Sequence, residues 1–392
     1  MDSQLLLEAL FWSAVIVTVY VYLGYPTLLA AWARLAPKPV HSSPVTPGVS
    51  IVIAARNEAA ALRGRLDNLL ESDYPHDRMQ IIVVSDGSTD ETVDVLRSYR
   101  GRIDAIVLPP SGKASAINAG VAAADHEILV FADARQTFAP DALRALVAPL
   151  ADPAVGGVSG ELILDCESGV GDSTIGDGVG AYWRYEKWLR RQESLVGSTL
   201  GSTGAIHALR RELWQPLPDE TILDDVLAPM QAVLAGARVV FEGSAIAYDR
   251  VAPAAATEFK RKTRTLAGNY QLIRLQPRLL IPFLNPVWLQ FVSHKLGRLI
   301  VPYALVVMFA TSAALTSYHL FYGAAFAAQV VFYGLAAYGA VLDRRGLPSV
   351  ARSARGLPSV ARSARGLPSV ARSAKEGCED RTAQGQHIGE HA

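Results

Sequence analysis

Two long uncharged stretches bracket the chain. No charged residue lies between Glu8 and Arg34, and none lies between Arg298 and Asp343. A helix that crosses a bilayer needs about 20 apolar residues, so the first stretch predicts one span and is too long for the apolar region of a signal peptide. The second stretch is roughly twice that length and predicts two spans. The predicted transmembrane helices cover residues 9–33, 299–317 and 320–342. Buried core helices in a soluble protein are the alternative interpretation.

Basic residues flank these stretches consistently. They are Arg34, Lys38, Lys295, Arg298, Arg344 and Arg345. Because Lys and Arg concentrate on the cytoplasmic side of a membrane, the pattern predicts an outside N-terminus and a cytoplasmic central region. We therefore expect a multi-pass protein of the cell (inner) membrane.

Between the spans, apolar runs typical of buried strands alternate with helical patterns. A proline-rich linker at 34–48 leads into a predicted domain at 49–276. The predicted strands are 49–55, 81–84, 103–108 and 128–132, and the predicted helices are 58–70, 90–99 and 113–123. This alternation predicts an α/β fold with a parallel sheet covered on both faces. The apolar residues 279–292 are too short for a span and predict an interfacial helix.

Composition and the tail change this picture little. Lys plus Arg and Asp plus Glu both number 37, and this balance argues against a general nucleic-acid binder. The two cysteines, Cys166 and Cys378, lie far apart and suggest neither a disulfide framework nor a metal site. The segment 345–392 begins with three identical ten-residue repeats. It predicts a solvated, disordered tail, and contact of its basic residues with anionic lipid is the alternative.

Polar residues follow three of the predicted strands, at the end where ligands bind in parallel sheets. Asn57 and Glu58 follow the first strand, Asp86 follows the second, and Asp133 follows the fourth. Asp86 can accept hydrogen bonds from a base or a ribose, and a capping role is the alternative. An acid at the end of a buried strand, such as Asp133, needs a partner. Mg²⁺ or Mn²⁺ bridging a diphosphate is a natural one.

Three further positions carry charge suited to phosphate binding or proton transfer. Lys113 follows Gly112 at a predicted helix start, where anions are favoured, although the spacing of a P-loop is absent. Asp224 and Asp225 are adjacent, and one of them is a candidate general base; acids that only favour the helix dipole are the alternative. Arg264 lies on a basic helix and suits phosphate geometry, with attraction to lipid headgroups as the alternative.

Together these motifs resemble those of the membrane-bound family 2 glycosyltransferases, which include cellulose, hyaluronan and poly-N-acetylglucosamine synthases. The resemblance covers residues 10–342. It implies a GT-A domain and inverting transfer of a sugar from a nucleotide-diphospho-sugar, commonly a UDP-sugar. It also implies a divalent metal, Mg²⁺ or Mn²⁺, and a polysaccharide or glycolipid acceptor at the membrane. Export or synthase proteins are among the partners that it implies.

The same resemblance implies a role for each motif. The implied nucleotide-sugar-binding residues are Asn57, Glu58, Asp86, Lys113, Asp133 and Arg264, and Asp133 is also the implied metal ligand. Gly204, in the loop 201–204, and Asp224 are implied on the acceptor side, and Asp225 is the implied catalytic base.

Two positions depart from the family's pattern. Arg135 stands where the metal-binding D-x-D motif has its second acid, and Thr265 stands where the Q-x-x-R-W motif has its tryptophan. The second departure disfavours processive extension of a long glucan. A non-catalytic membrane protein that binds a nucleotide or assists a synthase is therefore the alternative function. A sugar-1-phosphate nucleotidyltransferase is disfavoured because it would have no need for three spans.

Overall fold

The computed structural model describes residues 3–165, 174–250 and 255–344. The chain divides into two compact units, Met1–Ala337 and Tyr338–Ala392, and only the helical residues 338–344 of the second are described. The repeats and the rest of the predicted tail lie outside the described residues.

Within the described residues, the central domain is built on an eight-stranded mixed sheet in the order β3-β2-β1-β4-β7-β6-β8-β5. Its strands are β1 Val49–Ala55, β2 Met79–Asp86, β3 Asp104–Leu108, β4 Ile128–Ala132, β5 Thr137–Phe138, β6 Val155–Asp165, β7 Ile206–Arg210 and β8 Arg238–Arg250. β1, β2, β3 and β4 run parallel, whereas β7 is antiparallel to both β4 and β6. β8 runs parallel to β6 and antiparallel to β5. The parallel part is the one that the alternating pattern predicts, so the α/β fold class is confirmed.

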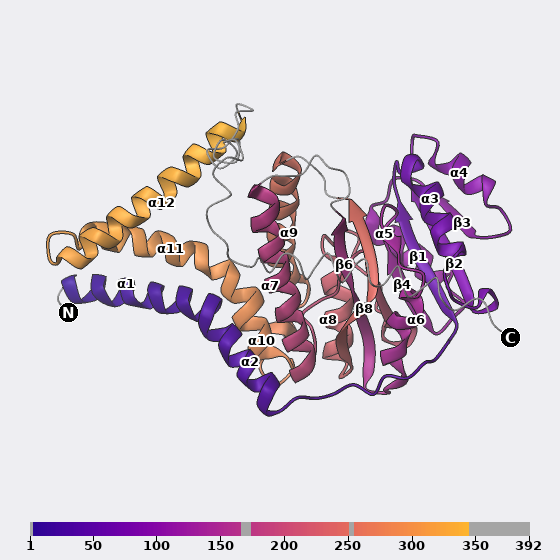
Figure 1. The fold of residues 1–392 in the computed structure, drawn as a ribbon, viewed down its shortest axis with the longest axis horizontal. Helices are drawn as coiled ribbons and strands as arrows, with labels where there is room; N and C mark the ends of the chain where they lie inside the picture. Colours follow the sequence, from indigo (N-terminus) through magenta and orange to yellow (C-terminus); the bar gives the residue numbers. More distant parts are fainter. Residues whose placement is uncertain (1–2, 166–173, 251–254, 345–392) are drawn as a thin grey trace, which may run out of the picture. The chain divides into compact units, whose positions relative to one another are not determined.

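Helices cover both faces of this sheet (Figure 1). They are α3 Ala59–Leu70, α4 Thr92–Ser98, α5 Lys113–Ala122, α6 Ala142–Val147, α7 Thr174–Val196, α8 Asp224–Leu234 and α9 Ala255–Leu275. Ile51 and Ile53 of β1 pack in one buried core with α3, α4 and α6, and Val52 packs in a second core with α5 and α8. Successive residues of a strand face opposite sides. Because both sides are covered, the strands are continuous apolar runs rather than alternating ones.

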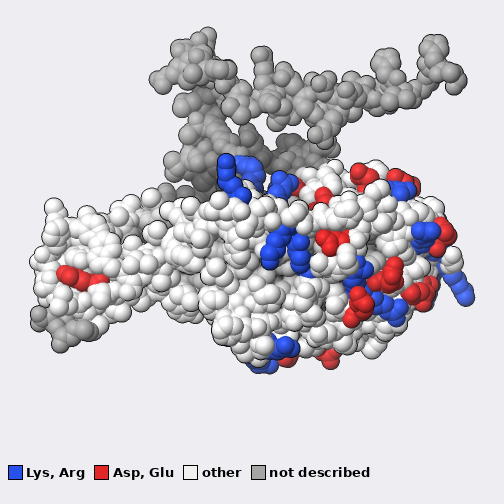
Figure 2. Space-filling model, turned by 90° about the horizontal axis from the view of Figure 1, so that it is seen from below, with Lys and Arg blue, Asp and Glu red and all other residues white. Residues whose placement is uncertain are grey.

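Within the described part of the chain, three helices are long and apolar enough to cross a membrane. The first is continuous over Ser3–Leu35 and consists of α1 Ser3–Val19, a π-helical turn Tyr20–Gly24 and α2 Tyr25–Leu35. The second, Trp288–Ala314, joins α10 Trp288–Gln290, the π-helical segment Phe291–Leu296 and α11 Gly297–Ala314. The third lies within α12 Leu320–Arg344. Figure 2 shows charged side chains spread over the central domain, whereas the surface around α1 is free of them apart from one acidic spot. The orientation in the membrane stays a prediction.

The prediction of an interfacial helix over residues 279–292 is wrong. The structure has a 3₁₀ turn at Pro277–Leu280, an irregular segment, and then the start of the second long helix at Trp288. Pro282 and Pro286 explain the break, because proline lacks the N–H that a helix needs and disfavours helical geometry in the residue before it. The second long helix consequently begins before residue 299, the predicted start of the span.

Candidate active site

The predicted site residues meet at one edge of the sheet, beyond the ends of the parallel strands. Asn57 and Glu58 follow β1, Asp86 is the last residue of β2, and Asp133 follows β4. Lys113 is the first residue of α5, directly after Gly112, whose φ of 92° only glycine adopts readily. The parallel arrangement brings these polar groups together, as expected from the sequence.

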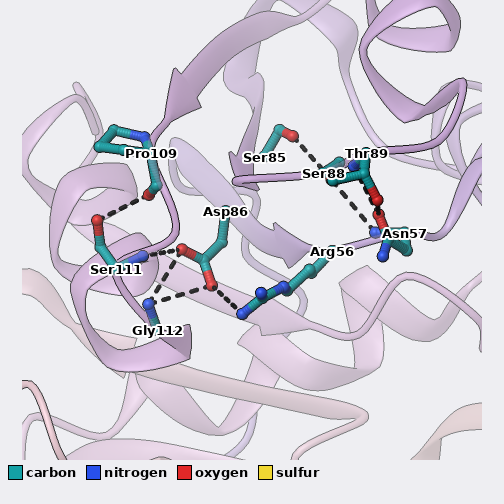
Figure 3. Close-up of polar contacts among 9 residues, drawn as sticks. All are labelled: Arg56, Asn57, Ser85, Asp86, Ser88, Thr89, Pro109, Ser111 and Gly112. Atoms are coloured by element: carbon teal, nitrogen blue, oxygen red, sulfur yellow. Dashed lines mark hydrogen bonds and ion pairs between the residues drawn. The ribbon is translucent and has the colours of Figure 1, made fainter.

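Asp86 is buried and ties the end of β2 to the start of α5 (Figure 3). Its Oδ1 accepts hydrogen bonds from the backbone N–H groups of Ser111 at 2.6 Å and Gly112 at 3.0 Å. Arg56 Nη1 lies 3.8 Å from Oδ2. The carboxylate of Asp86 therefore fixes the conformation of the turn that precedes α5. A different acid, Asp90, binds the first turn of α4: its Oδ1 accepts the backbone N–H of Thr92 at 3.0 Å.

Asn57 joins the turn after β1 to the turn after β2 (Figure 3). It adopts a positive φ of 56°, a conformation that asparagine tolerates better than most residues. Its Oδ1 accepts the backbone N–H of Thr89 at 2.8 Å, and its own N–H donates to Ser88 Oγ at 3.2 Å. The next residue, Glu58, donates its N–H to Thr92 Oγ1 at 3.0 Å. The two turns thus form one rigid wall of the site.

Lys113 lies between two carboxylates from different strand ends and helices. Its Nζ is 3.4 Å from Asp133 Oδ1 and 3.1 Å from Asp224 Oδ2. Burial alone would lower the pKa of Lys113, but the charges of Asp224, Asp133 and Asp225 raise it above its usual range. The lysine is therefore a permanent cation that links the end of β4 to the start of α8.

Asp225 occupies the first turn of α8 beside the loop Gly201–Gly204. The backbone carbonyl of Asp225 accepts the N–H of Ser202 at 2.7 Å, and a Cβ at Gly204 would lie 3.4 Å from Asp225 Oδ2. Burial and the charge of Asp224 raise the pKa of Asp225 to about 6, against the attraction of Lys113. A carboxylate with a pKa close to neutral can accept a proton from a hydroxyl group during a reaction.

Arg264 lies at the border of this edge, on α9. Its Nη2 donates to the carbonyl of Ile222 at 3.3 Å, two residues before Asp224, and the side chain is exposed. Arg135 is exposed beside Glu58 and opposes the rise that burial causes in the pKa of Glu58. The structure therefore groups all of the predicted site residues, with the two arginines at the rim.

The family model for Glycosyl transferase family 2 matches residues 50–215, from β1 through β7. Residues 50–215 are a family 2 glycosyltransferase domain. The match contains Asn57, Asp86, Lys113 and Asp133, whereas Asp225 lies beyond it.

The chain is also similar in sequence to curated proteins that are named as glycosyltransferases or polysaccharide synthases. The chain is 25% identical over 282 residues to the probable glycosyltransferase YdaM of Bacillus subtilis, covering 68% of this chain and 65% of that protein. It is 22% identical over 238 residues to the poly-beta-1,6-N-acetyl-D-glucosamine synthase of Staphylococcus aureus strain COL, covering 58% of this chain and 55% of that protein. The chain thus spans about 55–65% of the length of these curated relatives.

One solved structure is similar to a larger share of the chain than these relatives are. It is that of the mannosyltransferase PcManGT from Pyrobaculum calidifontis, in complex with GDP-Man and Mn²⁺. The TM-score is 0.61 at 25% sequence identity, covering 86% of this chain and 98% of that one. The GT-A fold of the glycosyltransferase domain is confirmed.

Two residues that support the candidate site, Arg65 and Asn68, were not predicted from the sequence. Arg65 of α3 is fully buried, stacks 3.9 Å over the Phe138 ring and donates to Asn68 Oδ1 at 2.9 Å. Asn68 in turn bonds both backbone groups of Phe138, at 2.7 and 2.9 Å, and so fixes the strand that follows the Asp133 turn. A buried arginine gives no recognisable signal, because arginine in a helical pattern is normally assigned to the exposed face.

The donor set at Asp133 decides how a divalent metal would fit. Within the described residues, no group of three or more His, Cys, Asp or Glu side chains could hold a metal ion. Mg²⁺ commonly takes one or two protein carboxylates and completes its shell with substrate phosphates and water. Asp133 therefore fits a metal that arrives with a nucleotide diphosphate, and Arg135 occupies the position where the D-x-D motif has its second acid.

Proposed function

We propose that the chain is an inverting glycosyltransferase that moves a sugar from a nucleotide-diphospho-sugar to a saccharide or lipid acceptor at the cytoplasmic face of the membrane. The observation that carries the proposal is the position of Asp225. This acid has a pKa of about 6 and lies beside the Gly204 loop, and Lys113 connects its neighbour Asp224 to Asp133. A base, a cation and a phosphate-side carboxylate are thus available at one edge of the sheet.

The donor half of the site consists of the turns after β1 and β2 and the start of α5. The wall formed by Asn57, Glu58 and Asp86 is rigid and polar, which suits recognition of a base and ribose. Lys113, at the N-terminus of α5, suits the diphosphate, because a helix N-terminus favours anions. The donor that we expect is a UDP-sugar. A GDP-sugar is the second candidate, because the similar structure of PcManGT was solved with GDP-Man.

The reaction follows from these positions. The acceptor hydroxyl gives its proton to Asp225, and the oxygen attacks the anomeric carbon from the side opposite the diphosphate. The new C–O bond forms as the bond to the diphosphate breaks, so a single displacement inverts the anomeric centre. Lys113 and Arg264 neutralise the charge that develops on the departing nucleotide diphosphate. A divalent metal held by Asp133 would add electrophilic neutralisation of the same charge.

The acceptor and the location rest on the three long apolar helices. A chain anchored by such helices would present its acceptor site next to the bilayer. A polysaccharide or glycolipid acceptor agrees with this placement and with the named function of the Staphylococcus aureus relative. An export or synthase protein is the partner class that such a product would require.

A donor screen tests the proposal. Membranes that contain the full chain are incubated with each UDP- and GDP-sugar, and both nucleoside diphosphate release and labelled product are measured, with membranes lacking the chain as the control. We expect release and product with one donor class. Tight binding of UDP or GDP without turnover of any donor would contradict the proposal and favour a non-catalytic nucleotide-binding role.

A further inference from the structure

A buried carboxylate joins the catalytic domain to two of the membrane-length helices. Glu193 of α7 is 1% exposed, and its Oε1 accepts the hydroxyl of Tyr25 at 3.0 Å. His294 Nδ1 lies 2.7 Å from the same oxygen. Tyr25 is the first residue of α2, and His294 belongs to the π-helical segment before α11. One oxygen atom therefore connects three helices that are far apart in the sequence.

The two membrane-length helices have unusual geometry at this point. Both contain a π-helical segment, at Tyr20–Gly24 and at Phe291–Leu296. The segments touch each other, because the hydroxyls of Tyr20 and Ser293 are 2.8 Å apart. π-helical turns are rare and occur frequently at functional sites. We therefore regard the contact of Glu193, Tyr25 and His294, called the α7 junction below, as more than ordinary packing.

The α7 junction is connected to the candidate active site through one helical turn. Arg190, three residues before Glu193 on α7, donates from Nη1 to Thr203 Oγ1 at 3.0 Å. Thr203 belongs to the loop Gly201–Gly204, whose Ser202 N–H donates to the Asp225 carbonyl at 2.7 Å. A displacement of α7 would therefore move the loop that packs against Asp225.

Within the described residues, α7 makes no hydrogen bond to Asp86 or Lys113 of the donor half; Lys113 reaches the acceptor side only through Asp224 on α8. Asp86 and Lys113 are held by the ends of β2 and β4 and by α5 and α8. Apolar packing of Leu29 and Ala33 of α2 against Leu189 of α7 would also persist without the polar contacts of the junction. Weakening the junction should therefore loosen the acceptor side while the fold and the donor side stay intact.

From this arrangement we infer that Glu193 is a positioning residue for the acceptor half of the reaction. It fixes α7 to the membrane-length helices, and Arg190 passes that fixed position to the Gly201–Gly204 loop and to Asp225. The inference rests on the proposed function, because it assigns the acceptor to this loop. The membrane helices are then part of the catalytic architecture and more than an anchor.

Amide hydrogen exchange tests the connection without any need for turnover. The full chain in lipid vesicles is compared with Tyr25→Phe and Glu193→Ala, and exchange is followed in the peptide that contains residues 201–204. We expect about five-fold faster exchange there in both variants, the change that losing one buried hydrogen bond produces. Tyr20→Phe is the matched control, because it removes a hydroxyl contact between the same two helices that does not involve α7. Unchanged exchange in both variants, or the same increase in Tyr20→Phe, would overturn the connection.

Kinetics with the donor found in the screen test the assignment to the acceptor side. We expect about five-fold slower sugar transfer in Tyr25→Phe and Glu193→Ala, with the donor KM and the dissociation constant for UDP or GDP unchanged. Glu193→Gln keeps an oxygen that can accept both hydrogen bonds and should restore most of the transfer. A parallel loss of donor affinity would overturn the positioning role. If the wild-type chain transferred no sugar, the proposed function would fail while the exchange experiment still decided the connection.

Discussion

The charge of Asp224, in addition to burial, should raise the pH at which the enzyme loses activity in acid. Burial raises the pKa of Asp225 from 3.8 to about 6, and the charge of Asp224 is the second largest cause of this rise. That rise corresponds to about 3 kcal/mol against the charged form. A general base works only when it is deprotonated, so kcat/KM should fall as the pH drops through about 6.

The substitution Asp224→Asn removes the neighbouring charge and leaves the burial in place. We expect the pKa of Asp225 to fall to about 5, since one nearby charge commonly shifts a pKa by about one unit or more. At pH 5 the deprotonated fraction of the base would then rise from about one tenth to about one half. Relative to its own plateau, activity at pH 5 should therefore increase about five-fold, even if the plateau itself is lower.

The assay is a pH profile of kcat/KM for sugar transfer, with Asp94→Asn as the control. Asp94 is an exposed acid on α4 that pairs with Arg97, so its loss should leave the profile unchanged. A profile of Asp224→Asn whose acid limb stays at the wild-type pH, or moves to higher pH, would refute the electrostatic coupling of Asp224 and Asp225.

Two further predictions concern packing and buried hydrogen bonds. Gly120→Ala would place a Cβ 2.5 Å from Val52 Cγ1 and should destabilise the domain by about 1–3 kcal/mol. The matched change Gly64→Ala on α3 meets nothing within 4 Å and should stabilise the domain by up to about 1 kcal/mol, because alanine favours the helix more than glycine does. Thermal unfolding measures both, and equal melting temperatures would show that α5 does not pack this closely on the sheet. Asn68→Ala leaves the backbone N–H and C=O of Phe138 without their side-chain partner, so we expect a loss of about 2–3 kcal/mol in denaturant unfolding. A loss below 0.5 kcal/mol, the usual range for exposed positions, would contradict that role.

Much of the central fold could be predicted because its pattern is local. Strands buried on both faces are short apolar runs, and β1, β2, β3 and β4 all lie within or close to the predicted ranges. The antiparallel part was not predicted. β7 inserts between β4 and β6, and pairing across such long sequence separations leaves no periodic signal in any one segment. The helix expected over 279–292 does not form because Pro282 and Pro286 interrupt the apolar segment.

The site could be located for a related reason. In parallel sheets, ligand-binding side chains lie just beyond the carboxyl ends of the strands. Once β2 and β4 were predicted, Asp86 and Asp133 were therefore candidates for the site. Asp225 needed the resemblance to a known family, because an acid at a helix start is common for electrostatic reasons alone. Arg65 and Glu193 were missed, since a charged side chain in a helical pattern gives no sign that it is buried. Their roles come from tertiary contacts.

The most direct test of the account is sugar transfer by Asp225→Asn. The amide keeps the shape of the carboxylate, and it resembles the neutral form that burial favours, so the variant should be at least as stable as the wild type at pH 7. We expect UDP or GDP to bind with unchanged affinity, while transfer from the donor found in the screen falls at least about 100-fold, the usual contribution of a general base. Asp94→Asn should retain full transfer. Undiminished transfer by a folded Asp225→Asn would contradict the assignment of Asp225 as the base and, with it, the proposed mechanism.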